Sequence, residues 1–184
     1  DATEMRNYLE VATRQCDRLH RLVNDLFQLT KLEAHDVTLQ RESFSVAELA
    51  QDVAQKFALK LEAQGLRLET DIPEDLPLVE GDVGLLERCF DNLIENAVRH
   101  TPSGGVLRVA LSRGEPSGVT VRVSDTGTGI DARDLTRIFD RFYQAGRPGE
   151  PHRRGTGLGL SIVAGLVREM RGTLARVAYS SVLY

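Results

Sequence analysis

The 184-residue sequence contains no tryptophan, two cysteines and six prolines, and only 5% of its residues are aromatic. Cys16 and Cys89 are far apart and both occupy apolar positions of helical patterns, so neither a metal-binding pair nor a disulfide framework is suggested. No apolar run approaches the roughly 20 residues that span a bilayer, and the acidic start lacks the plan of a signal peptide. We therefore expect a soluble chain in the reducing cytoplasm, without membrane contact of its own.

The charge balance argues against nucleic acid as a partner. The formal net charge is -4 and the pI is about 5.6, which gives no general attraction to nucleic acid or to anionic lipid. Hydrophobic residues make up 41% of the chain, enough for one core and a small appendage.

The N-terminal segment has the heptad pattern of a helix that packs on other helices. Its apolar residues recur at alternating steps of four and three: Met5, Leu9, Ala12, Cys16, Leu19, Val23 and Leu26. A second line, Leu22, Leu29 and Leu32, widens the apolar stripe. A coiled-coil-like helix of about 30 residues would be roughly 45 Å long and would need helical partners.

The remaining sequence mixes helices and strands. Helices are expected from the capping pattern Ser45 to Glu48 up to about Gly65, over Gly84–Arg99 and over Leu158–Met170; strands are expected over Leu66–Ile72, Val106–Leu111, Val119–Val123 and Thr173–Tyr179. This order predicts an α+β fold, a two-layer α/β sandwich at 39–184 preceded by the long helix at 1–38.

The expected helix at 84–99 has one polar and one apolar face. At 100° per residue, one sector roughly 100° wide holds Asn92, Glu95, Asn96 and Arg99. An asparagine oxygen is a suitable neutral ligand for magnesium, and an arginine one turn on can meet a phosphate. Taken alone, the same pattern also fits amides and charges that simply face water.

Two glycine-rich segments add chemistry to this helix. Asp125-Thr-Gly-Thr-Gly129 follows an expected strand, where an aspartate can accept from the adenine amine while glycines let the backbone approach. Gly155-Thr-Gly-Leu-Gly159 precedes a helix, whose N-terminus attracts phosphate. Each is weak alone. A basic loop at 146–154 replaces the strand that a dinucleotide fingerprint needs, and the lysine-bearing P-loop pattern is absent.

The order of the motifs is more specific than any one of them. The runs NLIENAVRHTP, DTGTGI, IFDRFYQ and GTGLGLSIV resemble the N, first-glycine, phenylalanine and second-glycine boxes of the ATP-binding catalytic domain of sensor histidine kinases. The resemblance extends from about Phe44 to Gly172. It implies the Bergerat-type fold of the gyrase, heat-shock, histidine-kinase and mismatch-repair superfamily, with a flexible lid at the basic loop.

This resemblance also implies ligands and roles. ATP and Mg²⁺ are the expected cofactors, with Asn96 as the metal ligand, and Asn92, Arg99 and Arg141 are the expected catalytic residues at the phosphates. Asp125 would read the adenine amine, and Phe139 and Phe142 would be core or lid-packing residues. The full cofactor-binding set is Asn92, Asn96, Arg99, His100, Asp125, Gly127, Gly129, Ile130, Gly155, Thr156, Gly157, Leu158 and Gly159.

Residues 19–33 resemble the second helix of the dimerisation and phosphotransfer hairpin of these kinases. The first helix, which carries the phospho-accepting histidine, is absent from this sequence, and none of His20, His35, His100 and His152 has the surroundings of an acceptor. The resemblance therefore implies a transferase of a two-component phosphorelay that forms homodimers through its helices. It would phosphorylate a histidine of the full-length kinase, and then a response-regulator aspartate, without labelling this fragment.

Other functions remain open at this point. Related ATPases place a glutamate base four residues before the magnesium-binding asparagine, where this chain has Asn92, so transfer is favoured over rapid hydrolysis. A nucleotide-sensing module like the kinase-related anti-sigma factors would lack the N-terminal helix. A degenerate relative is suggested by the segment from Arg171, which lacks the usual paired glycines and the Gly-Thr-x-Phe strand.

Overall fold

The computed structural model describes residues 1–34, 38–114, 118–145 and 155–172, and the chain separates into two compact units, Asp1–Val37 and Thr38–Tyr184. The basic loop at 146–154 and the strand expected from Thr173 lie outside the described residues. No helix in the described ranges has the length and apolar character needed to cross a membrane.

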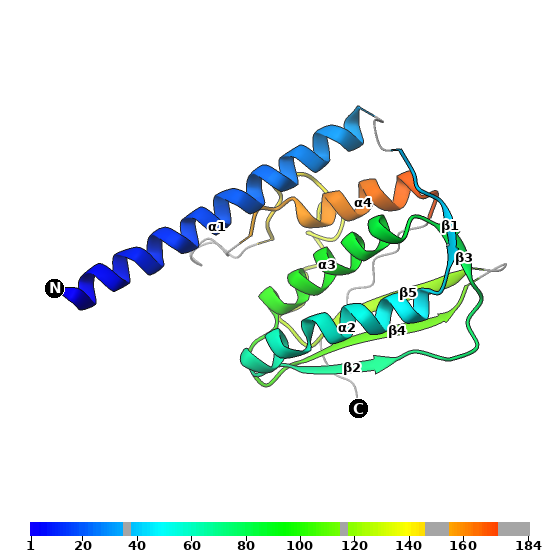
Figure 1. Ribbon diagram of the computed structural model, residues 1–184, viewed down its shortest axis with the longest axis horizontal. Helices are drawn as coiled ribbons and strands as arrows, with labels where there is room; N and C mark the ends of the chain where they lie inside the picture. The colour runs from blue at the N-terminus through cyan, green and yellow to red at the C-terminus, as the bar shows by residue number, and fades with distance from the viewer. Residues whose placement is uncertain (35–37, 115–117, 146–154, 173–184) are drawn as a thin grey trace. The chain divides into compact units, whose positions relative to one another are not determined.

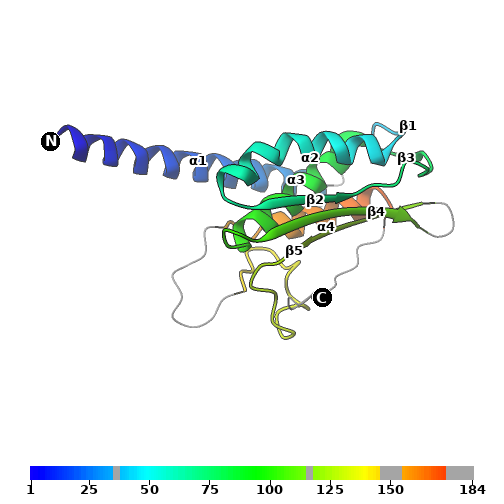
Figure 2. The same cartoon turned by 90° about the horizontal axis from the view of Figure 1, so that it is seen from below.

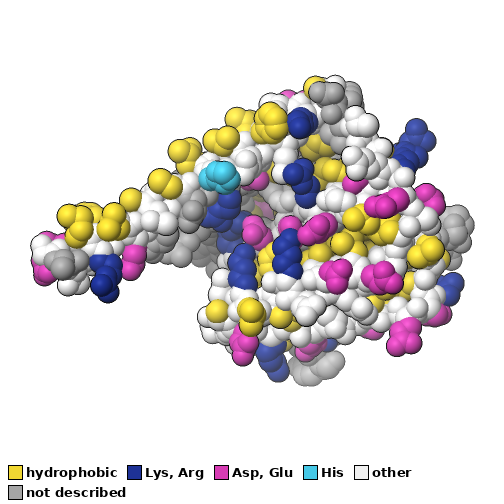
Figure 3. Space-filling view, viewed as in Figure 1, with side chains coloured by type: hydrophobic (Ala, Val, Ile, Leu, Met, Phe, Trp, Pro, Cys, Tyr) yellow, Lys and Arg dark blue, Asp and Glu magenta, His cyan; other side chains and the backbone are white. Residues whose placement is uncertain are grey.

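The first unit is the predicted long helix, α1 (Ala2–Glu33). It begins at Asp1, whose carboxylate accepts from the backbone N–H of Thr3 at 3.2 Å. Apolar side chains lie exposed along it, as Figure 3 shows, and those of the predicted seam are each more than half exposed: Met5, Leu9, Leu19, Val23 and Leu26. Such a continuous exposed stripe is typical of a helix that packs on other helices.

The second unit is a two-layer sandwich, which confirms the predicted fold class. Its larger sheet has the strand order β2-β4-β5, formed by β2 (Arg67–Asp71), β4 (Val106–Arg113) and β5 (Val119–Asp125). β4 pairs parallel with β2 and antiparallel with β5. The helices are α2 (Val46–Ala63), α3 (Val83–His100) and α4 (Gly159–Glu169). α2 and α3 cover one face of the sheet, and α4 packs beside α3 (Figures 1 and 2).

The core lies between the sheet and the helices. Side chains alternate along β4, so that Leu107 and Val109 are fully buried whereas Arg108 faces away from the core. Phe90 and Ile94 of α3 pack into the same cluster, and each is only 1% exposed. Their burial fixes which side of α3 is turned away from the sheet.

A small second sheet was missed by the sequence interpretation. β1 (Glu42–Phe44) pairs antiparallel with β3 (Val79–Gly81). Strands of three residues are too short to show a period of two, which explains the omission.

Asp82 follows β3 directly and fixes the start of α3. Its Oδ1 accepts from the backbone N–H of Leu85 at 3.0 Å, and its Oδ2 accepts from that of Gln40 at 2.9 Å. One buried carboxylate therefore caps α3 and, at the same time, binds the backbone at Gln40, before β1.

Replacing this carboxylate is expected to destabilise the fold. Asp82→Ala should lower the free energy of unfolding by about 2 to 3 kcal/mol, because it removes a cap and leaves a second N–H without its partner. Ser45→Ala, which removes a single cap bond from α2, should cost only about 1 kcal/mol. Urea denaturation of both variants measures the difference, and equal losses would contradict the double role of Asp82.

The two cysteines are expected to differ in reactivity. Cys16 is exposed, whereas burial raises the pKa of the Cys89 thiol to about 12. Because the thiolate is the reactive form, the folded chain at pH 8 should react rapidly with Ellman's reagent at one thiol, that of Cys16. Cys16→Ser should abolish this rapid reaction. Cys89 should react only on unfolding. A second fast-reacting thiol in the folded chain would contradict its burial.

Candidate functional site

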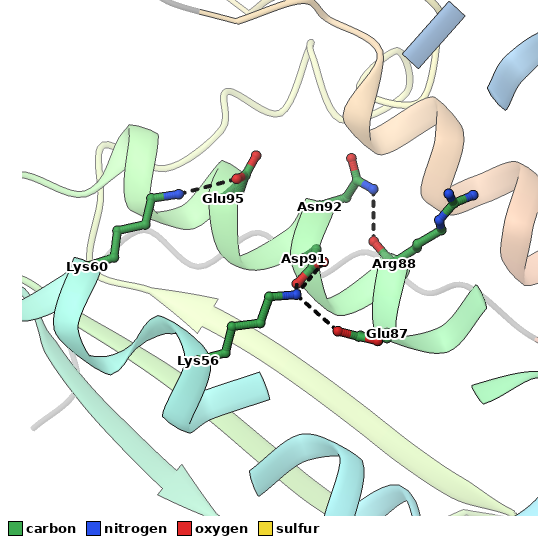
Figure 4. Close-up of polar contacts among 7 residues, drawn as sticks. All are labelled: Lys56, Lys60, Glu87, Arg88, Asp91, Asn92 and Glu95. Atoms are coloured by element: carbon green, nitrogen blue, oxygen red, sulfur yellow. Dashed lines mark hydrogen bonds and ion pairs between the residues drawn. The ribbon is translucent and has the colours of Figure 1, made fainter. Parts of the chain in front are cut away.

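The polar side of α3 lies against the start of α4 through Asn92. Asn92 donates from Nδ2 to the backbone carbonyl of Arg88 at 2.8 Å, which fixes the amide and leaves Oδ1 as an acceptor. A Cβ placed on Gly159 would lie 3.1 Å from that oxygen. Figure 4 shows Asn92 on the side of α3 that faces α4, whereas Asp91 turns toward α2. The second glycine-rich segment therefore reaches the predicted polar face.

Asn96 lies one turn after Asn92 on α3 and is half-buried. Its amide oxygen is a neutral, hard donor of the kind that Mg²⁺ accepts beside water and phosphate oxygens. The chemistry of this donor fits a magnesium ion held jointly by the protein and a polyphosphate.

Arg99 continues the same face at the end of α3. It is exposed, and a Cβ placed on Gly155 would lie 3.4 Å from its Nη1. Gln144 donates from Nε2 to the carbonyl oxygen of Gly155 at 2.8 Å, which ties the segment before the glycines to this point. Gln144 is the last residue of the run IFDRFYQ, but no role was predicted for it, because a single amide in a polar segment forms no pattern.

The first glycine-rich segment lies at the C-terminal end of α3. Asp125 is the last residue of β5, as predicted, and its Oδ1 accepts from the backbone N–H of Gly127 at 2.8 Å. A Cβ on Gly127 would lie 2.5 Å from that oxygen and 2.5 Å from the carbonyl oxygen of His100, so only glycine fits. This contact places Asp125 beside the end of α3.

Thr126 anchors the same turn to the sheet. Its Oγ1 accepts from the backbone N–H of Val106 at 2.9 Å, and its own N–H donates to the carbonyl of Val106 at 3.0 Å. The sequence interpretation passed over Thr126, since its partner lies 20 residues away. Gly129 follows with a left-handed φ of +69°, and Ile130 is 37% exposed.

The second glycine-rich segment closes against the backbone of Phe142. Gly157 has a φ of +73°, and a Cβ there would lie 2.7 Å from the carbonyl carbon of Phe142. Thr156 Oγ1 accepts from the N–H of Leu158 at 3.2 Å, and Leu158 is fully buried just before α4 begins. Gly157 therefore has both a conformational and a steric reason to be glycine.

Phe142 is not a core residue, whereas the alternative, that it packs against the lid, stays a prediction because the segment at 146–154 lies outside the described residues. Its side chain is 61% exposed and its φ is 59°, whereas Phe139 is half-buried. The backbone of Phe142, and not its ring, makes the contact with Gly157. Arg141 is exposed and immediately precedes this contact.

Most of the predicted residues are thus brought together around α3. Gly159 contacts Asn92, Gly155 contacts Arg99, and Gly127 contacts the carbonyl of His100. Glu95 differs from its neighbours: it shares their sector, but Lys60 of α2 binds its carboxylate at 3.2 Å. The resulting surface combines amide oxygens, a guanidinium group and the N-terminus of α4, which are groups that bind a metal ion and phosphates.

Comparison with known proteins supports this interpretation. Residues 81–182 match the family described as histidine kinase-, DNA gyrase B- and HSP90-like ATPases. Drug sensory protein A of Synechocystis is 35% identical over 95% of this chain, and the sensor histidine kinase TmoS of Ectopseudomonas mendocina is 34% identical over 90%. The chain spans only 28% and 17% of the lengths of these two relatives.

A solved structure agrees with the fold. Full-length ShkA, crystallised in complex with AMPPNP, superposes with a TM-score of 0.77 at 28% identity, covering 91% of this chain and 34% of ShkA. The family match extends over more than half of the sequence and includes α3 and both glycine-rich segments. The chain therefore belongs to the histidine kinase-, DNA gyrase B- and HSP90-like ATPases, as an ATP-binding catalytic domain of the histidine-kinase type.

Proposed function

We propose that this chain presents Mg-ATP to a histidine on a helix outside this sequence, as the catalytic part of a two-component sensor histidine kinase. The bond between the γ-phosphorus and the bridging oxygen to the β-phosphate breaks, a bond from the γ-phosphorus to an imidazole nitrogen forms, and ADP leaves. A response-regulator aspartate then receives the phosphoryl group. The observation that carries this proposal is that the second glycine-rich segment meets Asn92 and Arg99 of α3, while the first meets the backbone carbonyl of His100 at the end of the same helix.

The phosphates would lie between α3 and α4. Asn96 would hold the magnesium ion, which supplies neutralising charge at the phosphates, and Asn92 and Arg99 would bind phosphate oxygens. Backbone N–H groups of the segment 155–159, that of Thr156 among them, would add donors at the N-terminus of α4, whereas the N–H of Leu158 donates to Thr156 Oγ1. Arg141 would reach the terminal phosphate.

The adenine would lie at the first glycine-rich segment. Because Gly127 binds Oδ1 of Asp125, the second carboxylate oxygen is available to accept from the exocyclic amine of the base. Gly127 and Gly129 let the backbone approach the ring, and Ile130 and His100 would flank it.

Transfer to a protein side chain is favoured over hydrolysis because the residue at position 92 is a neutral asparagine. Its amide donates to the helix backbone at 2.8 Å, and a neutral amide cannot take a proton from water as a carboxylate base does. The comparisons give no support to a partner-binding module or to an inactive relative.

The helical unit would supply the assembly. The exposed seam of α1 supports packing against the first helix of a hairpin and against a second subunit, which would give a homodimer and a docking surface for the response regulator. The catalytic part would work in the cytoplasm, whether or not the full-length protein is anchored in a membrane.

Gly157→Ala is expected to impair nucleotide binding specifically. The added Cβ would collide with the backbone of Phe142, so the second glycine-rich segment must shift, and the dissociation constant for Mg-ATP should rise at least about tenfold. Gly104→Ala is the matched control, since Gly104 has a φ of +85° but nothing within 4 Å. It carries the same kind of backbone strain outside the second glycine-rich segment and without a collision. Titration calorimetry compares the two, and equal affinities would contradict the placement of the phosphates.

The catalytic proposal is tested with γ-labelled ATP. The chain is mixed with a separate hairpin that carries the acceptor histidine, and label is expected on the hairpin but not on this chain. Asn96→Ala should abolish the labelling because it removes the proposed magnesium ligand. Labelling that persists in this variant would overturn the role of Asn96, and rapid phosphate release by the chain alone would overturn transfer.

A further inference from the structure

Three carboxylates form a row on one side of α3. Glu87, Asp91 and Glu95 are spaced four residues apart, which puts them on one flank of the helix. Lys56 and Lys60, also four residues apart, approach this row from α2 (Figure 4). We call these five side chains the α2–α3 ladder.

The ladder consists of short, charged contacts. Lys56 Nζ lies 2.9 Å from both carboxylate oxygens of Asp91 and 3.0 Å from Oε1 of Glu87. The hydrogen bond to Asp91 is the largest of the effects that raise the pKa of Lys56, so this ammonium stays charged. Lys60 Nζ lies 3.2 Å from Oε1 of Glu95. Each lysine is therefore assigned to particular carboxylates.

Stability alone does not account for the ladder. The side chains of Lys60 and Glu95 are 47% and 39% exposed, and pairs this exposed contribute little to the free energy of unfolding. Figure 3 shows basic and acidic side chains beside one another over α2 and α3, on a surface open to solvent. What the pair does fix is the position of the Glu95 carboxylate, which Lys60 holds at 3.2 Å.

The position of Glu95 relative to Arg99 suggests that function. Glu95 precedes Arg99 by four residues, which places the two side chains only about 40° apart around α3. A glutamate four residues before a cationic side chain is the favoured geometry for an ion pair on a helix. Glu95 therefore has two cations within its range, and in the structure its carboxylate binds the lysine of α2.

We propose that Lys60 is a positioning residue for the nucleotide phosphates, because it holds the Glu95 carboxylate away from Arg99 and from the phosphate-binding face of α3. This inference rests on the proposed function of that face. Without Lys60, the Glu95 carboxylate would be an unpaired negative charge beside a site that must accept a polyphosphate anion, whereas the ion pair with Lys60 balances that charge. Lys60 acts through Glu95 and does not contact the nucleotide.

The test is a double-mutant cycle on the dissociation constant for Mg-ATP. Lys60→Gln should weaken binding about fivefold at low salt, since a released carboxylate competes with the phosphates for Arg99 and repels them. Lys60→Gln combined with Glu95→Gln should restore the affinity of the unaltered chain, and Lys60→Arg should retain it. The weakening should shrink at 0.5 M salt, where charges are screened.

A matched control separates this effect from general loss of charge. Arg108 binds Glu69 on the sheet, and that pair is 48% and 43% exposed, so Arg108→Gln removes one cation at equal exposure. It should leave the affinity unchanged. Lys60→Gln should unfold at the same temperature as the unaltered chain, which excludes a loss of fold.

Three results would overturn the inference: full affinity in Lys60→Gln, a double variant as weak as Lys60→Gln, or equal weakening in Arg108→Gln. The second result would show a purely structural role for Lys60. Failure of the unaltered chain to bind Mg-ATP would instead overturn the proposed function itself.

Discussion

The orientation of α3 is the constraint on which the site depends. Phe90 and Ile94 must be buried against the sheet, and this burial leaves the helix no freedom to rotate about its axis. Asn92, Asn96 and Arg99 are on the opposite side of the same helix, so the packing that stabilises the core also aims the polar groups. A substitution that loosens the packing of Phe90 would therefore change the direction of these polar groups, although Phe90 lies on the other face.

The glycines complete the site because, without a side chain, the backbone of the two glycine-rich segments can lie directly against α3. Gly127 lies against the carbonyl of His100, and Gly159 lies against Asn92. These contacts draw two segments that are distant in sequence onto one helix. On the neighbouring flank of α3, ion pairs join Asp91 and Glu95 to Lys56 and Lys60 of α2.

Much of this organisation follows from the sequence, and the limits have physical reasons. The heptad seam predicts α1, the cap at Ser45 predicts α2, and the strand pattern before Asp125 predicts β5, because each depends on local periodicity or local hydrogen bonds. The order of the motifs identifies the family. The roles assigned to single residues, such as Asn96 as the metal ligand, stay predictions that the experiments above address.

Features that depend on distant contacts could not be predicted. β1 and β3 are too short to show a pattern, and the partner of Thr126 lies 20 residues away. Phe142 has a large apolar side chain of the kind found in cores, but its backbone is left-handed and its ring is exposed. The pairing of Glu95 with Lys60 joins residues 35 apart, so the helical wheel of α3 alone placed Glu95 with Asn92, Asn96 and Arg99.

The parallel pairing of β2 with β4 has a consequence for how the domain acquires its site. Parallel neighbours need a crossover connection, and here that connection contains α3, so that Glu69 and Arg108 meet although they are 39 positions apart in the sequence. Contacts of such high contact order form late in folding, because the entropy of closing the intervening loop must first be overcome. The sheet and the helix that carries the polar face are thus expected to form in one cooperative step. A form in which the sheet is not yet paired would lack the polar face, so a ligand of that face could not bind it and protect it from proteolysis.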